Sequence, residues 1–187
     1  MLCLAGNFIS DEISSSIINL IISTEELHIY SVHKLYIAMK SNMSQEALMK
    51  VGIYILGELG YDLISNSVEG PEGESIVITE EELVNHLMEI NSRKYSNDIK
   101  EYLMNCLMKL ITKLTMQNSK EKMKNCLEEE SKSYNCEVQQ RAVEYIFFTN
   151  LNNFNLKKNI MSNVPNSKLV KETETKKYLL ILMSFFE

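Results

Sequence analysis

The stretch Ser44–Leu63, SQEALMKVGIYILGELGYDL, decides the fold of this chain. Its apolar residues follow a helical period, and its charged side chains form one narrow stripe at Glu46, Lys50 and Glu58. A helix with so narrow a polar stripe is covered on most of its circumference. The stretch therefore predicts a helix with packed neighbours on both sides.

The composition favours helices throughout the chain. The 187 residues include only two prolines and six glycines, whereas an all-β fold needs turn residues at short, regular intervals. The chain is 45% hydrophobic and 24% charged, which is ordinary for a folded soluble protein. These values predict an all-α protein.

Charge and cysteine content limit the function classes. The formal net charge of −6 disfavours a general phosphate-binding surface, so we expect no nucleic-acid partner. The four cysteines form no CxxC pair and no secretory signal precedes them, which predicts reduced thiols and a cytoplasmic location. The longest apolar run, Tyr178–Phe186, is too short to cross a bilayer.

Apolar periodicity predicts further helices before and after the central one. Two capping boxes, Ser23–Glu26 and Thr79–Glu82, mark where two of these helices start. The segment Ser65–Ile78 contains glycine, proline and three glutamates, so we expect an exposed acidic loop there. The expected helices cover residues 11–22, 23–40, 79–91, 96–116, 120–130 and 137–149, with a short helix that ends near residue 163.

The spacing of these helices predicts their arrangement. Short connections favour antiparallel packing of successive helices, and helix pairs recur at roughly 35–45 residues. The segment 96–116 is apolar on two flanks, with a narrow polar face formed by Glu101, Asn105, Lys109 and Thr112. These features fit an α-solenoid of HEAT/armadillo-like helix pairs better than a closed bundle. A compact all-α domain is the alternative, because no strict repeat of residues is visible.

Residues that could carry out catalysis or bind metal are scattered. His28 and His33 are five residues apart and point about 140° away from each other on a helix, and His86 stands alone, so each is expected to be hydrogen-bonded or exposed. The segment Gly70–Gly73 lacks the lysine and the preceding strand of a phosphate loop. Glu58 is the nearest to an isolated acid in apolar surroundings. We therefore predict no catalytic, cofactor-binding or metal-binding residues.

The cysteines give no metal site either. Cys106, Cys126 and Cys136 fall on separate predicted elements, which is the wrong spacing for zinc. Cys106 lies in an apolar stripe and is expected to be a small core residue.

Several stretches follow, in order, the pattern of one known family. They are Ala5–Phe8, Glu26–Tyr30, LGELGYDL at Leu56–Leu63 and, most specifically, EVQQRAVEY at Glu137–Tyr145. Together they resemble the large adaptins, and in particular the gamma-type large chain of clathrin-associated adaptor complexes. The resemblance covers about residues 5–165.

The resemblance implies a scaffold rather than an enzyme. Adaptin trunks are α-solenoids that assemble with a beta-type large chain, a medium chain and a small chain. The assembled complex binds peripherally to trans-Golgi and endosomal membranes from the cytoplasm and recruits clathrin. By this resemblance the chain is a non-enzymatic structural subunit, without a cofactor, in vesicle-mediated intracellular protein transport, and meets clathrin only indirectly.

The departures from the family define two expected regions. Residues 1–165 form a trunk-like solenoid that includes the loop 65–78, and residues 166–187 form a divergent tail. This tail ends in YLLILMSFFE, and Leu182–Phe186 lacks the acidic last residue of a clathrin-binding motif. The resemblance places the chain in the C-terminal part of the trunk, as a fragment, a divergent chain or a truncated one. A stand-alone HEAT-like binding scaffold, or the same segment of an alpha- or epsilon-type adaptin, is the alternative.

Overall fold

The computed structural model of the chain describes residues 9–69 and 75–151. This part consists of α-helices, one short 3-10 helix and a pair of two-residue strands. The elements in chain order are α2 (Asp11–Ser23), η2 (Glu25–Leu27), α3 (His28–Ser41), α4 (Glu46–Ser65), β1 (Val68–Glu69), β2 (Ser75–Ile76), α5 (Glu80–Ser92), α6 (Asn97–Lys113), α7 (Gln117–Glu130) and α8 (Cys136–Asn150).

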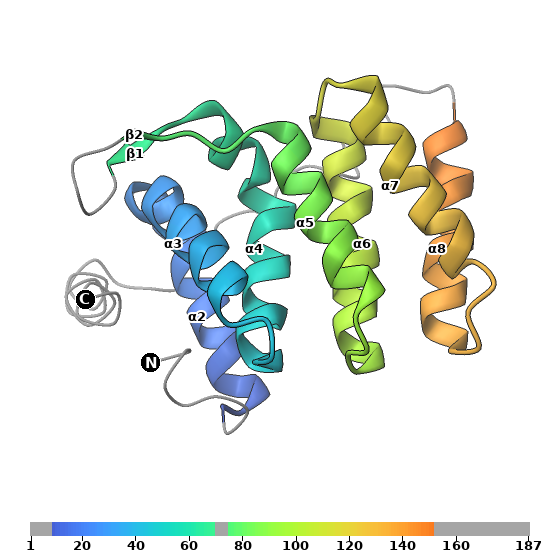
Figure 1. The fold of residues 1–187 in the computed structure, drawn as a ribbon. Coiled ribbons are helices and arrows are strands. Elements are labelled where there is room, and N and C mark those ends of the chain that lie inside the picture. Colours follow the sequence, from blue (N-terminus) through green and yellow to red (C-terminus); the bar gives the residue numbers. More distant parts are fainter. Residues whose placement is uncertain (1–8, 70–74, 152–187) are drawn as a thin grey trace.

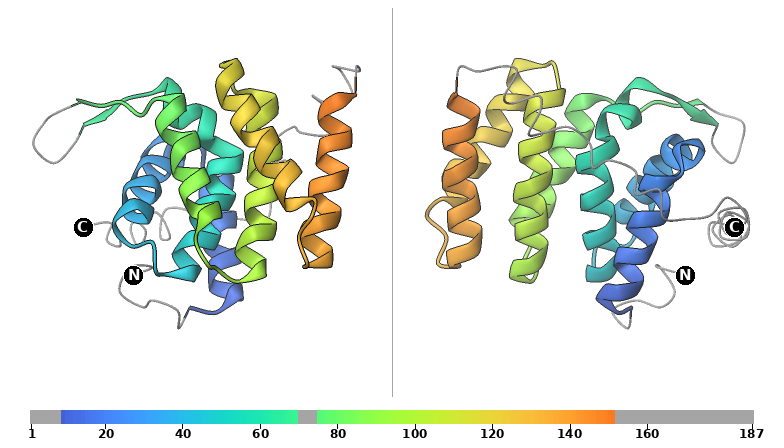
Figure 2. Two further views of the ribbon diagram at one scale, coloured as in Figure 1. Left: turned by 45° about the vertical axis from the view of Figure 1, so that its right-hand side comes forward. Right: turned by 180° about the vertical axis from the view of Figure 1, so that it is seen from behind.

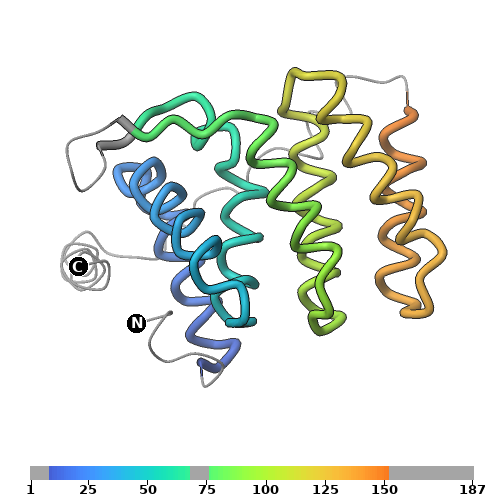
Figure 3. The backbone as a smooth tube through the Cα atoms, in the orientation of Figure 1, coloured from blue at the N-terminus to red at the C-terminus, as the bar shows by residue number. Residues whose placement is uncertain are grey.

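The helices form two layers that alternate along the chain (Figures 1 and 2). Helices α2, α4, α6 and α8 stand side by side in one layer, and α3, α5 and α7 lie across them in the other. The backbone trace runs back and forth between the layers and advances in one direction (Figure 3). Each helix pair stacks mainly on the pair next to it, which is the architecture of a solenoid. The predicted all-α solenoid is confirmed.

Helix α4 lies inside this stack, as its sequence predicts. It packs against α2 and α6 within its own layer and against α3 in the other layer. One departure concerns Glu58, which was expected on a polar stripe but is buried with 2% exposure. The reason is that α6 packs beside this part of α4, covers Glu58, and supplies Lys109 as a charge partner for the Glu58 carboxylate.

One predicted capping box forms and the other does not. The Thr79 hydroxyl accepts a hydrogen bond from the Glu82 backbone N–H, and the Glu82 carboxylate accepts one from the Thr79 backbone N–H. At the expected first box, the Ser23 hydroxyl donates instead to the Leu20 carbonyl of α2, 3.1 Å away, and the chain makes a 3-10 turn. Similarly α4 starts at Glu46 and not at the expected Ser44.

The predicted acidic loop contains more order than expected. Its ends pair as antiparallel strands, with Val68 opposite Ile76 and Glu69 opposite Ser75. The other expectations for Gly70–Gly73, for Cys3 and the segment Ala5–Phe8, for the helix ending near residue 163 and for the tail 166–187 fall on residues outside the described ones.

Hydrogen bonds at the helix ends hold successive pairs together. The Glu80 carboxylate, at the start of α5, accepts from the backbone N–H groups of Thr115 at 3.2 Å and Met116 at 2.9 Å, just before α7. At the opposite ends of the helices, the Tyr95 hydroxyl, between α5 and α6, donates to the Met43 carbonyl before α4. These bonds cross between helix pairs, so they fix how neighbouring pairs stack.

Candidate functional site

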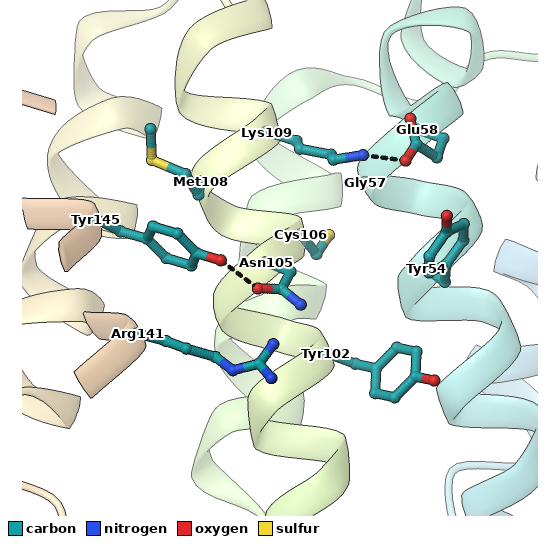
Figure 4. A pocket seen from close by; sticks show the side chains of 10 residues that line it. All are labelled: Tyr54, Gly57, Glu58, Tyr102, Asn105, Cys106, Met108, Lys109, Arg141 and Tyr145. Atoms are coloured by element: carbon teal, nitrogen blue, oxygen red, sulfur yellow. Dashed lines mark hydrogen bonds and ion pairs between the residues drawn. The ribbon is translucent and has the colours of Figure 1, made fainter. Parts of the chain in front are cut away.

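A cavity of about 320 Å³ crosses the layer formed by α4, α6 and α8 (Figure 4). We call it the trough. Helical spacing brings its side chains together, because residues three, four and seven apart lie on one face of a helix. The side chains that define it are Tyr54 and Glu58 from α4, Tyr102, Asn105 and Lys109 from α6, and Tyr145 from α8.

A close contact between helices forms the floor of the trough. A Cβ atom built on Gly57 would lie 3.1 Å from the Cα atom of Cys106, so a side chain at this position would push α4 and α6 apart. Cys106 is buried, as its apolar setting predicts, and burial raises the pKa of its thiol to about 12. The thiol therefore stays protonated and acts as packing.

An ion pair closes the α4–α6 side of the trough. Lys109 Nζ forms a short contact with Glu58 Oε1, and both residues line the cavity. Lys113, one turn further along α6, donates to the main-chain carbonyls of Glu58 at 2.7 Å and Gly57 at 3.2 Å. Burial lowers the pKa of Lys113, and the nearby Glu58 carboxylate opposes this effect. Glu58 therefore joins two helices and is not an isolated acid.

On the α6–α8 side, one hydrogen bond to an amide and the ion pair between Arg141 and Glu101 join the two helices. The Tyr145 hydroxyl donates to Asn105 Oδ1, which fixes the orientation of the Asn105 side chain. Nearby, Arg141 Nη2 lies 2.7 Å from a Glu137 carboxylate oxygen and 3.6 Å from Glu101 Oε2. The positive charge of Arg141 is thus neutralised by the protein itself.

Several hydrogen-bonding groups of the trough have no partner among the described residues. They are the hydroxyls of Tyr54 and Tyr102, the Asn105 amide nitrogen and Glu58 Oε2. The two tyrosine rings meet edge to face, with centroids 6.3 Å apart. Burial, and secondarily the Glu58 carboxylate, raises the pKa of Tyr54, so its phenol stays neutral. The free groups of the trough are therefore mostly uncharged.

The histidines lie apart from the trough. His33 is buried, with Nδ1 2.8 Å from the Ile29 carbonyl oxygen and Nε2 3.2 Å from that of Asn66. His28 Nε2 lies 3.2 Å from the Ile22 carbonyl oxygen. Both are hydrogen-bonded, as expected.

The expectation for His86 is wrong. This ring is buried with 3% exposure, and neither ring nitrogen has a hydrogen-bond partner in the described structure. It packs edge to face against Tyr36, with ring centroids 5.3 Å apart, in the contact between α3 and α5. Burial lowers its pKa to about 4, so the ring is neutral near pH 7. The burial of His86 results from the packing of α5 against Tyr36 of α3, which the sequence around His86 does not show.

The described residues bear on two further features, metal-binding clusters and membrane-spanning helices. Within residues 9–69 and 75–151, His, Cys, Asp and Glu side chains do not gather in groups of three that could hold a metal ion. None of the helices in these ranges combines the length and the apolar character that crossing a bilayer requires.

Comparison with known proteins assigns the family. A family model described as the adaptin N-terminal region matches residues 1–153. The chain belongs to the adaptin family. The expected placement in the C-terminal part of the trunk is not supported, because the matching family model describes the N-terminal region of adaptins.

Known relatives favour the gamma type. The chain is 32% identical over 168 residues to an AP-1 complex subunit gamma of Dictyostelium discoideum, a match that covers 88% of this chain and 18% of the relative. It is 34% identical over 165 residues to an AP-1 complex subunit gamma-1 of Schizosaccharomyces pombe, covering 86% of this chain and 19% of that protein. An AP-2 complex subunit alpha-2 of Dictyostelium discoideum matches only 36% of this chain. The chain spans less than a fifth of the length of these gamma relatives.

Sequence reasoning named some of the side chains that define the trough without bringing them together. Glu101, Asn105 and Lys109 were recognised as the polar face of one helix, and Glu58 as part of the polar stripe of another. The tyrosines of α4 and α6 were missed, because nothing in a single helix shows which residues face the next repeat. The i, i+4 spacing of Tyr54 and Glu58 places both side chains on one face of α4, and this spacing was the signal in the sequence that could have indicated the site.

Proposed function

We propose that this chain is a non-enzymatic structural subunit of a clathrin-associated adaptor complex, acting in vesicle-mediated protein transport between the trans-Golgi network and endosomes. The observation that carries the proposal is the likeness to AP-1 gamma subunits over 88% of the chain. The solenoid supports it, since stacked helix pairs present a long surface to partner proteins.

The proposed partners follow from the same likeness. They are a beta-type adaptin large chain, a medium chain and a small chain, with clathrin reached indirectly through the complex. The chain would then reside in the cytoplasm and associate peripherally with Golgi and coated-vesicle membranes. The architecture agrees with a scaffold role: Glu58 of the trough is paired with Lys109, and the nearby Arg141 is paired with Glu137, which suits packing better than proton transfer.

The test is affinity purification of the endogenous protein, followed by quantitative mass spectrometry of the proteins that remain bound. We expect a beta-type adaptin, a medium chain and a small chain in equal amounts with this chain. A bait that carries Leu59→Ala in the buried centre of α4 is expected to be destabilised, so it shows whether capture depends on the folded chain. The far-ultraviolet circular dichroism of both baits is recorded alongside. A folded bait that retains none of these chains contradicts the proposal and favours a stand-alone binding scaffold.

A further inference from the structure

We propose that the trough binds an extended, uncharged segment of a partner protein, with the Asn105 amide donating to a main-chain carbonyl of that segment. This goes beyond the proposed function, because binding of a peptide to this chain requires no adaptor complex. The proposal depends on three features of the trough: its charge balance, its free hydrogen-bonding groups and its direction across the helices.

The charge balance favours a neutral ligand. Lys109 is paired with Glu58, and Arg141 with Glu137 and Glu101. A charged ligand group would have to compete with these pairs and lose its own hydration. A neutral group faces neither cost.

The free groups match the polar atoms of a peptide. Because Tyr145 holds Asn105 Oδ1, the Asn105 amide nitrogen is left as a donor for a carbonyl oxygen. The hydroxyls of Tyr54 and Tyr102 can accept from a peptide N–H, and their rings offer an apolar wall for a side chain. Glu58 Oε2 is a further acceptor beneath the surface. A main chain supplies both a donor and an acceptor at each residue.

The direction of the trough favours an extended conformation. The cavity is lined by three helices that stand side by side in one layer (Figure 4). Neighbouring packed helices are about 8–10 Å apart, and an extended chain advances about 3.3 Å per residue, so roughly six residues reach from α4 to α8. A helical ligand satisfies its own main-chain groups and would leave the Asn105 donor unused.

The test is a nuclear magnetic resonance titration of the full chain with a capped peptide of roughly that length in which leucine and serine alternate. We expect saturable shifts of the Asn105 side-chain amide and of main-chain amides around Tyr102. Two further peptides, with glutamate or lysine in place of serine, are expected to bind at least several-fold more weakly.

Substitutions separate binding from folding. Asn105→Asp keeps an acceptor for the Tyr145 hydroxyl but removes the amide donor, and is expected to weaken binding about tenfold. Tyr102→Phe removes only a hydroxyl and should weaken binding by a smaller factor. Gln139→Ala and Tyr61→Ala change exposed residues of α8 and α4 outside the trough and serve as matched controls, with unchanged affinity.

Three results would overturn the inference. These are the absence of saturable shifts at millimolar peptide, equal or tighter binding of a charged peptide, and unchanged binding by a folded Asn105→Asp variant. The first result would show that the trough does not bind a peptide of this kind. None of them bears on the proposed function, which fails independently if the purified protein carries no adaptor chains.

Discussion

Helices α4 and α8 belong to the same layer but differ in how much of their surface is covered. In α4, thirteen of 20 residues are buried, whereas in α8 only Val138 and Ala142 are buried among 15. Val143 and Phe147 of α8 lie one turn apart with 51% and 69% exposure. Among the described helices, α4 has neighbours on both sides within its layer, and α8 is the last of the row.

This difference shows how a solenoid distributes its stability. A helix pair buries its apolar face by stacking on its neighbours, so a central helix gains packing from two sides and an outer one from one side. The same chemical change should therefore cost more in α4 than in α8.

Truncation of a buried side chain should give the largest contrast. Leu59→Ala in α4 removes a side chain with 1% exposure, and we expect a loss of about 3 kcal/mol in the free energy of unfolding. Phe147→Ala in α8 removes a larger but exposed side chain, and should cost less than about 1 kcal/mol. Urea denaturation followed by circular dichroism measures both. Equal losses would show that α8 is packed as fully as α4.

An ion-pair comparison tests the same idea with charges. Glu58→Gln leaves Lys109 without its buried carboxylate, and should cost about 2 kcal/mol, since Lys109 keeps partial access to water. Glu137→Gln in α8 breaks an exposed pair with Arg141 and should cost less than about 0.5 kcal/mol. The measurement is again urea denaturation, now at two salt concentrations. If added salt removes the cost at Glu58 as fully as at Glu137, the pair behaves as a surface contact.

The helical architecture was predictable because it depends on local patterns. Apolar periodicity located the helices to within a few residues, and the box at Thr79–Glu82 marked the start of α5 correctly. The box at Ser23–Glu26 failed because Ser23 is the last residue of α2, and a residue inside one helix does not have the non-helical backbone that an N-cap of the next helix needs. A capping motif in sequence cannot show whether its first residue still belongs to the preceding helix.

The environments of single polar groups were not predictable to the same degree. Glu58 had been placed on a polar stripe, and His86 had been expected to be exposed or hydrogen-bonded, yet both are buried between helices. Their surroundings are supplied by residues about 50 positions away, such as Lys109 beside Glu58 and Tyr36 beside His86. Helical periodicity identifies the face on which a residue lies, but the partner of that face depends on how the pairs stack.

The same comparison can be made with pH at His86, whose ring is buried between α3 and α5 and has no hydrogen-bond partner among the described residues. Burial lowers its folded-state pKa from 6.5 to about 4, and the positive charge of Lys40 acts in the same direction. The unfolded chain therefore binds a proton more readily than the folded one. Stability is full well above pH 6.5 and falls as the pH drops towards 4, by roughly 1 kcal/mol at pH 5.5 from this group. Urea midpoints between pH 8 and pH 5 measure the decline.

A substitution at His86 separates this contribution from those of other titrating groups. His86→Phe keeps the edge-to-face contact with Tyr36 and cannot be protonated, so the decline below pH 6.5 should become smaller by about that amount. Asn85→Gln, at the exposed neighbouring position in α5, is the matched control and should keep the wild-type slope. An unchanged slope in His86→Phe would mean that the ring admits its proton without opening the α3–α5 contact. The contact between α3 and α5 would then be less tightly packed than the burial of His86 implies.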